Sequence, residues 1–128
     1  MLQLCRALGA PVIGTASSPE GLQAVLANGA RHALDHGSPE YLRLVPQCTD
    51  GHGVDVVIEM LANTNLEADM ACLAKYGRLV VVGSRGSLTF TPRLTMIKEA
   101  TVMGMALWNT PRAEWEACSA GVSAALGV

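Results

Sequence analysis

Long apolar runs, excess positive charge and aromatic residues are all scarce in this chain of 128 residues. No apolar stretch approaches the roughly 18 residues that a membrane-spanning helix needs. Aromatic residues make up only 4% of the sequence, so we expect a core of aliphatic side chains and methionine. The formal net charge of −2 argues against binding to nucleic acid or to an anionic membrane, since both require a basic patch.

Closely spaced cysteines are absent as well. Cys5, Cys48, Cys72 and Cys118 lie far apart and form no Cys-x-x-Cys pair, which argues against a metal site or a redox dithiol. The N-terminus lacks the basic start, apolar middle and small-residue cleavage site of a signal peptide. We therefore expect reduced thiols, no metal ion and a cytoplasmic location.

Proline positions organise the secondary structure that we predict. Four prolines follow a serine or threonine, and a hydroxyl before a proline is typical of a helix start: Pro19, Pro39, Pro92 and Pro111. The expected helices are 2–8, 18–27, one from 38 that Pro46 shortens, 65–73, 91–99 and one from 110. The expected strands are 11–16, 31–34, 54–61, 78–82 and 101–107, with a turn at 76–77. This alternation predicts an α/β fold with a doubly wound parallel sheet.

The run 78–82 is the most informative strand. Its consecutive aliphatic residues are typical of a strand buried on both faces, and they stop abruptly at Gly83, Ser84 and Arg85. Glycine lets a ligand approach the backbone, and arginine offers donors that suit a phosphate. We interpret this strand end as one wall of a nucleotide site. The alternative is an ordinary buried strand followed by a solvated Arg85.

The other predicted strands also end in small, polar or amide-bearing residues. Because the carboxyl ends of parallel strands share one edge of a sheet, these strand ends are expected to line one crevice. They are 16–18, 35–36, 62–65, 83–85 and 105–107.

The first strand end indicates which nucleotide is bound. Ser17 and Ser18 stand where an NAD site usually carries a carboxylate, and a helix N-terminus there favours a phosphate, which predicts NADP over NAD. Alternatively, the two serines simply cap the helix. His36 is a candidate partner for phosphate or adenine, or else a solvated turn residue. We assign no catalytic residue, and neither Asp55 nor Glu59 receives such a role.

Three longer runs resemble a known family. Residues 58–66, 81–86 and 95–99 are similar to the NADPH:quinone oxidoreductases of the zinc-independent medium-chain dehydrogenase/reductase superfamily, the zeta-crystallin group. The resemblance covers essentially the whole chain. It implies NADPH as cofactor, a quinone as electron acceptor, and a cytosolic homo-oligomer. The implied cofactor contacts are Ser17 (where glycine is typical), His36, Asn65, Val82, Gly83, Ser84, Arg85, Met105, Ala106 and Leu107.

Two departures from that family limit the expected activity. The chain contains no G-x-G-x-x-G run, and the first strand of the nucleotide fold is missing with that loop. We expect residues 1–128 to be a partial, Rossmann-like NADP-binding domain, with the catalytic GroES-like domain absent from the chain. Isolated, it is expected to bind NADPH weakly or not at all and to show no turnover.

The resemblance also implies an assembly surface. In the superfamily, the edge strand that corresponds to 101–107 pairs across a subunit interface, so Met103, Met105 and Trp108 are either interface or core residues. An alternative function follows, namely a truncated, non-catalytic module that binds or sequesters partner subunits.

Overall fold

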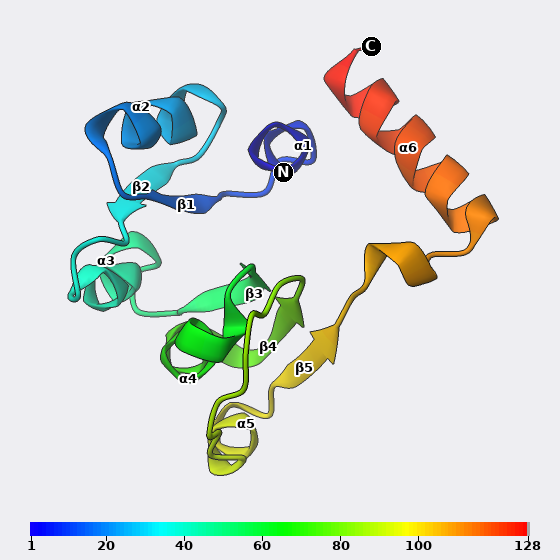
Figure 1. Ribbon diagram of the computed structural model, residues 1–128. Coiled ribbons are helices and arrows are strands. Elements are labelled where there is room, and N and C mark those ends of the chain that lie inside the picture. The colour runs from blue at the N-terminus through cyan, green and yellow to red at the C-terminus, as the bar shows by residue number, and fades with distance from the viewer. Residues whose placement is uncertain (128) are drawn as a thin grey trace. The chain divides into compact units, whose positions relative to one another are not determined.

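The computed structural model describes residues 1–127 (Figure 1). The elements run α1 (Leu2–Ala7), β1 (Ile13–Ala16), α2 (Pro19–Ala27), β2 (His32–Asp35), η1 (Tyr41–Leu44), α3 (Val45–Cys48), β3 (Val54–Glu59), α4 (Ala62–Cys72), β4 (Leu73–Val81), α5 (Arg93–Lys98), β5 (Thr101–Gly104), η2 (Leu107–Asn109) and α6 (Arg112–Leu126). Strands and helices alternate, which confirms the predicted α/β class. The chain divides into two units: unit 1 is Met1–Tyr41 with the segment from Leu107 onward, and unit 2 is Leu42–Ala106.

Unit 1 contains a parallel pair of strands. β1 pairs with β2 in the register Ile13 opposite His32 and Ala16 opposite Asp35, so both strands end at the same edge. Helix α2 packs on this pair closely: a Cβ on Gly14 would lie 2.6 Å from the Val25 side chain. Glycine is therefore needed in β1 for the helix to approach the strand.

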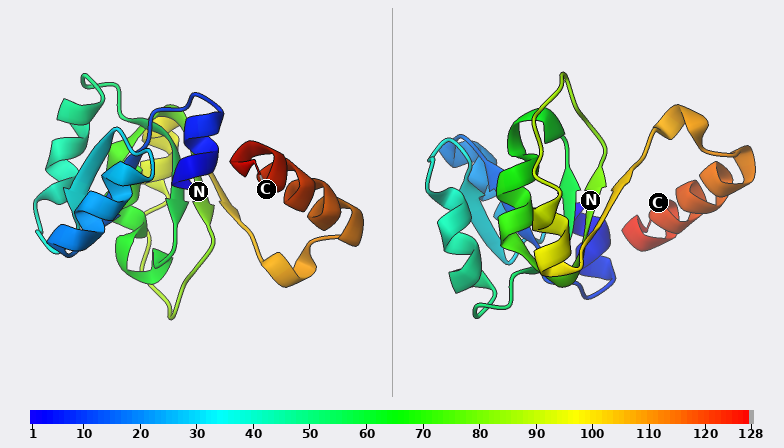
Figure 2. Two further views of the ribbon diagram at one scale, coloured as in Figure 1. Left: turned by 90° about the horizontal axis from the view of Figure 1, so that it is seen from above. Right: turned by 90° about the horizontal axis from the view of Figure 1, so that it is seen from below.

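Unit 2 contains a parallel sheet of three strands in the order β3-β4-β5. Helices α4 and α5 lie side by side against one face of this sheet (Figure 2). The core between them is formed by Leu66, Met70, Leu73 and Leu79, of which the last three are fully buried. Burial of these large apolar side chains is the main stabilising contribution in this unit.

Strand β4 starts earlier than predicted, at Leu73, and includes the turn that was predicted at Tyr76–Gly77. Tyr76 adopts a left-handed conformation with φ +65°, which interrupts the extended backbone as a turn does. From the pair Val54–Leu73 to the pair Val56–Arg78, β3 advances by two residues and β4 by five, so the extra residues lie on β4. After this irregularity, regular pairing resumes with Val57 opposite Leu79. The predicted turn is thus present as a local distortion within β4, and the predicted start of this strand is wrong.

The helix predicted from Ser38 is also wrong. The Tyr41 amide instead donates to the Ser38 carbonyl in a turn, followed by η1 and the one-turn helix α3. Pro46 lies in the first turn of α3, where its missing N–H is tolerated. A proline at that position suits a helix start and not a helix interior, so one long helix is replaced by two short ones.

Only one of the four predicted hydroxyl caps forms. Ser18 Oγ accepts the Gly21 amide at 3.0 Å, whereas Pro92 and Pro111 themselves occupy the N-cap positions of α5 and α6. Substituting Ser18 by alanine is expected to cost about 1 kcal/mol of unfolding free energy, because an amide of α2 loses its partner. Thr110→Ala, which removes no cap bond, is the control. Urea unfolding curves that coincide for the two variants would contradict this assignment.

Candidate functional site

The loop after β4 is tied to the end of β3 by backbone hydrogen bonds. The Val82 and Gly83 amides donate to the Glu59 carbonyl at 2.8 and 3.2 Å, and the Ala62 amide donates to the Gly83 carbonyl at 2.9 Å. A Cβ on Gly83 would lie 2.2 Å from the Met60 carbonyl oxygen. Glycine is thus required here for a close approach between two backbone segments.

Asn63 holds the next two residues of this loop. Its Oδ1 accepts the Arg85 amide at 2.8 Å and lies 3.4 Å from Ser84 Oγ. This hydrogen bond fixes the Arg85 backbone, while the Arg85 side chain is exposed to solvent. Asn63 was predicted only as part of a polar strand end, and the available signal was its position shortly after the apolar run of β3.

Asn65 lies on the same helix as Asn63, but its amide group points into the protein. Its Nδ2 donates to Glu59 Oε1 at 3.2 Å, and the Leu61 amide donates to the same oxygen. Glu59 exposes only 7% of its surface. No catalytic role was predicted for Glu59, and in the structure its carboxylate anchors the start of α4.

Asp69 is a second buried carboxyl group, exposing 6% of its surface. Burial, a hydrogen bond with Glu59 and repulsion by that carboxylate raise the pKa of Asp69 from 3.8 to about 8. Its Oδ2 has no hydrogen-bond partner. Burial also raises the pKa of the Cys72 thiol, and Asp69 adds to that effect while Lys98 opposes it. The surroundings of Asp69 and Cys72 therefore favour the protonated, neutral form of both groups.

Strand β5 brings further predicted residues to the same edge of the sheet. The Met105 amide donates to the Val81 carbonyl at 2.9 Å, which continues the β4–β5 pairing just beyond Gly104. Unit 2 therefore holds seven predicted contacts at or beside the carboxyl ends of its strands: Asn65, Val82, Gly83, Ser84, Arg85, Met105 and Ala106. Leu107 belongs to unit 1, in η2, so the strand predicted to continue through 107 is too long.

Unit 1 holds Ser17 and His36 at the ends of β1 and β2. His36 Nδ1 lies 3.1 Å from Thr15 Oγ1, and the His36 amide donates to the Ala16 carbonyl. Both predicted residues are exposed, and Ser17 immediately precedes the capped N-terminus of α2. The pairing of β1 with β2 thus places them at one strand edge, as the sequence predicts.

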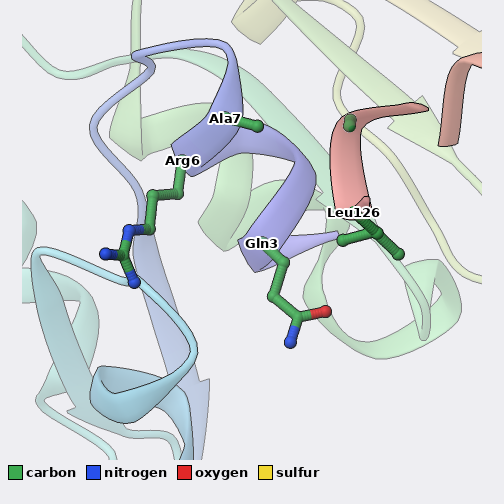
Figure 3. Close-up of a pocket in the computed structure, with 5 residues that line it drawn as sticks. Gln3, Arg6, Ala7 and Leu126 are labelled. Carbon is green, nitrogen blue, oxygen red and sulfur yellow. The ribbon is translucent and has the colours of Figure 1, made fainter. Parts of the chain in front are cut away.

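An open groove in unit 1 lies elsewhere. It has a volume of about 290 Å³, and Figure 3 shows Gln3, Arg6 and Ala7 of α1 on one side with Leu126 of α6 on the other. None of the ten predicted cofactor contacts lines it. We therefore centre the candidate site on the strand ends.

Parallel strands that end in glycine, small polar residues and an exposed arginine define an α/β domain of the dinucleotide-binding type. The chain belongs to the family described as zinc-binding dehydrogenase, whose sequence profile matches residues 1–123. Family membership, together with likeness to solved quinone oxidoreductases, confirms the predicted medium-chain dehydrogenase/reductase superfamily and the α/β fold class.

Quinone oxidoreductases are among the similar curated proteins. The human protein is 37% identical over 98% of this chain and 38% of its own length, and the rat protein is 43% identical over 89% and 35%. The chain thus spans less than two fifths of these relatives. Among solved structures, the Escherichia coli quinone oxidoreductase complexed with NADPH is 25% identical, with TM-score 0.83 over 98% of this chain and 41% of its own. The Thermus thermophilus quinone oxidoreductase is 30% identical, with TM-score 0.71 over 98% and 38%.

The family description mentions zinc, but the described part of this chain does not fit that metal. Within residues 1–127, no three His, Cys, Asp or Glu side chains gather closely enough to hold a metal ion. We therefore derive no metal-dependent step.

Across residues 1–127, no helix combines the length and apolar character needed to cross a membrane.

Proposed function

We propose that this chain is the cofactor-binding part of an NADPH-dependent quinone oxidoreductase. The observation that carries the proposal is the fixed loop Gly83–Arg85 at the carboxyl ends of β3 and β4. Its backbone is held by Glu59, Ala62 and Asn63, so Arg85 presents its guanidinium without a large ordering cost. NADPH, when bound, supplies the electrons that a quinone accepts, and the protein supplies binding and orientation.

The described residues fit a nucleotide with several phosphates. In unit 2, the Arg85 guanidinium offers planar donors, and Gly83 leaves the backbone open to close approach. In unit 1, β1 ends in Ser17 beside the N-terminus of α2, where amides and the helix dipole favour the 2′-phosphate of NADPH. The exposed His36 provides a further donor there. These features support NADPH over NADH.

The strand order supports the proposal that the chain is part of a larger nucleotide fold. A dinucleotide-binding sheet has the order 3-2-1-4-5-6. Removing strand 1 leaves the groups 3-2 and 4-5-6, which correspond to the observed orders β2-β1 and β3-β4-β5. We therefore infer that this chain alone binds NADPH weakly or not at all and does not turn over.

The test uses two proteins: the 128-residue chain, and the same chain preceded by the segment that precedes the matched region in the rat relative. Calorimetry is expected to show micromolar NADPH affinity only for the extended protein. There, Arg85→Ala is expected to lose about 10- to 100-fold in affinity, because a hydrogen bond from a charged group contributes about 1.5–3 kcal/mol. Arg93→Ala on α5 is the control. Equal affinity of the two variants would refute the role of Arg85.

Homo-oligomerisation through β5 is a further part of the proposal. β5 pairs only with β4 among the described strands, and Val102 and Met103 are 38% and 41% exposed. An unpaired apolar edge is a template for pairing with another copy. Of the four residues that follow the end of β5, Met105, Leu107 and Trp108 are exposed, and Trp108 is 87% exposed.

Trp108→Glu is expected to dissociate the oligomer, since a carboxylate in an apolar interface remains without a partner. Met96→Glu, at a residue 73% exposed on α5, is the control. Sedimentation velocity measures both variants against the unmodified chain. An oligomer that survives Trp108→Glu would count against the interface.

A second candidate function is a non-catalytic module that binds or sequesters subunits. The two separate sheets favour it, because each leaves strand edges without a partner among the described strands. Purification together with a full-length quinone oxidoreductase, and loss of the activity of that enzyme, would favour this candidate over a cofactor-binding role.

We retain the cytoplasmic location as a proposal, supported by four free cysteines.

A further inference from the structure

Two buried carboxyl groups meet beneath the candidate site in unit 2. Glu59, the last residue of β3, accepts hydrogen bonds from the Leu61 amide and from Asn65 Nδ2. Asp69 lies four residues after Asn65 on α4, so the two side chains share one helix face. Glu59 and Asp69 expose 7% and 6% of their surfaces, and Asp69 Oδ2 has no hydrogen-bond partner.

Two carboxylates in contact cannot both remain ionised in a buried space without a nearby cation. The other titratable groups on the elements packed around Asp69 are exposed or have partners elsewhere. They are Asp55 (with His52), Glu67 (with the Thr91 amide), Cys72 (with the Leu42 carbonyl), Lys75 (with Glu99), Tyr76, Arg78, Arg93 and Lys98 (with the Leu73 carbonyl). A proton is the remaining means of neutralising the pair.

We propose that Glu59 and Asp69 share one proton and act together as a positioning pair for Asn65. The protonated Asp69 donates a hydrogen bond to Glu59, which also accepts hydrogen bonds from Asn65 Nδ2 and from the Leu61 amide. This arrangement fixes the orientation of the Asn65 amide at the start of α4. The link to the cofactor rests on the proposed function, whereas the shared proton and the position of Asn65 require no ligand.

The raised pKa of Asp69, about 8, sets the pH at which this arrangement changes. Below that pH the proton links the two carboxyl groups. Above it, two like charges occupy one buried space, which forces them apart and releases Asn65 from its fixed orientation. The orientation of Asn65 is therefore expected to depend on pH through residues that do not themselves meet the cofactor.

The experiment follows the side-chain amide resonances of Asn65 in the ¹⁵N-labelled 128-residue chain from about pH 6 to about pH 9.5. We expect one step centred near pH 8, absent in Asp69→Asn. Glu59→Gln keeps an acceptor for Asn65 and offers a donor to Asp69, so the resonances stay near their native positions and the step moves to lower pH. Asp55→Asn, at an exposed carboxylate of β3, is the control and keeps the native step.

A flat profile in the unmodified chain, or an unchanged step in Asp69→Asn, would overturn the proposal. The cofactor link is tested in the extended protein described above. Its NADPH affinity is expected to fall about threefold or more between about pH 7 and about pH 9, and to stay constant in Asp69→Asn. The same fall in both proteins would refute the link. Absence of NADPH binding at either pH refutes the proposed function, while the resonance step still decides whether the pair positions Asn65.

Discussion

Replacing Gly83 by alanine is expected to destabilise unit 2 by about 2–3 kcal/mol and to abolish cofactor binding by the extended protein. The added Cβ would lie 2.2 Å from the Met60 carbonyl oxygen and 2.9 Å from its carbon. Both are backbone atoms, so no side-chain rotation relieves the clash. The loop must move away from β3, and the hydrogen bond from the Ala62 amide to the Gly83 carbonyl is lost.

Gly86→Ala is a matched control in the same loop. Its Cβ would meet only Asn63 Nδ2, at an ordinary contact distance of 3.8 Å. Both tryptophans lie in unit 1, so fluorescence does not report on unit 2, and hydrogen exchange of the β3 and β4 amides is the better measurement. Equal protection in the Gly83 and Gly86 variants would show that the close approach does not require glycine.

Replacing Asp69 by asparagine is expected to stabilise unit 2 by about 1–3 kcal/mol near pH 7.5. Asparagine keeps a donor for Glu59 and removes the carboxyl group that must hold a proton while buried. In the unfolded chain this group ionises near its ordinary pKa of 3.8, whereas in the folded chain its pKa is about 8. The folded state therefore binds more protons between those values.

The sign of the pH dependence follows from that difference. Because the unfolded state releases the proton first, the unfolding free energy of the unmodified chain falls as pH rises from about 4 to about 8, and this group adds no further change above that range. Asp69→Asn is expected to flatten this part of the profile. Urea unfolding by circular dichroism at several pH values measures it. A variant that is no more stable than the unmodified chain at pH 7.5, or that keeps the same slope, would contradict the assignment.

The sequence predicted the features that depend on local order. The apolar run ending at Gly83 identified the central strand β4 of unit 2 and the loop that carries Arg85, because consecutive aliphatic residues leave a strong local pattern. Ser18 followed by proline identified the start of α2 for the same reason. The family resemblance then added a set of predicted cofactor contacts at these strand ends.

Other features arise from tertiary contacts and have no local signal. The roles of Asn63 and Glu59 depend on which loops lie beside each other, and the protonation of Asp69 depends on burial. The predicted caps at Thr91 and Thr110 were wrong because proline itself occupies the N-cap in α5 and α6. Helix boundaries shift easily by one or two residues, and hydroxyl capping requires the exact position.

The NADPH site proposed at the strand ends is best tested by following the amide resonances of the ¹⁵N-labelled extended protein as NADPH is added. We expect the amide resonances of Gly83, Ser84 and Arg85 to change most in unit 2. In unit 1, we expect those of Ser17 and His36 to change most. Changes confined to the groove lined by Gln3 and Arg6, with these strand ends unaffected, would contradict this proposal.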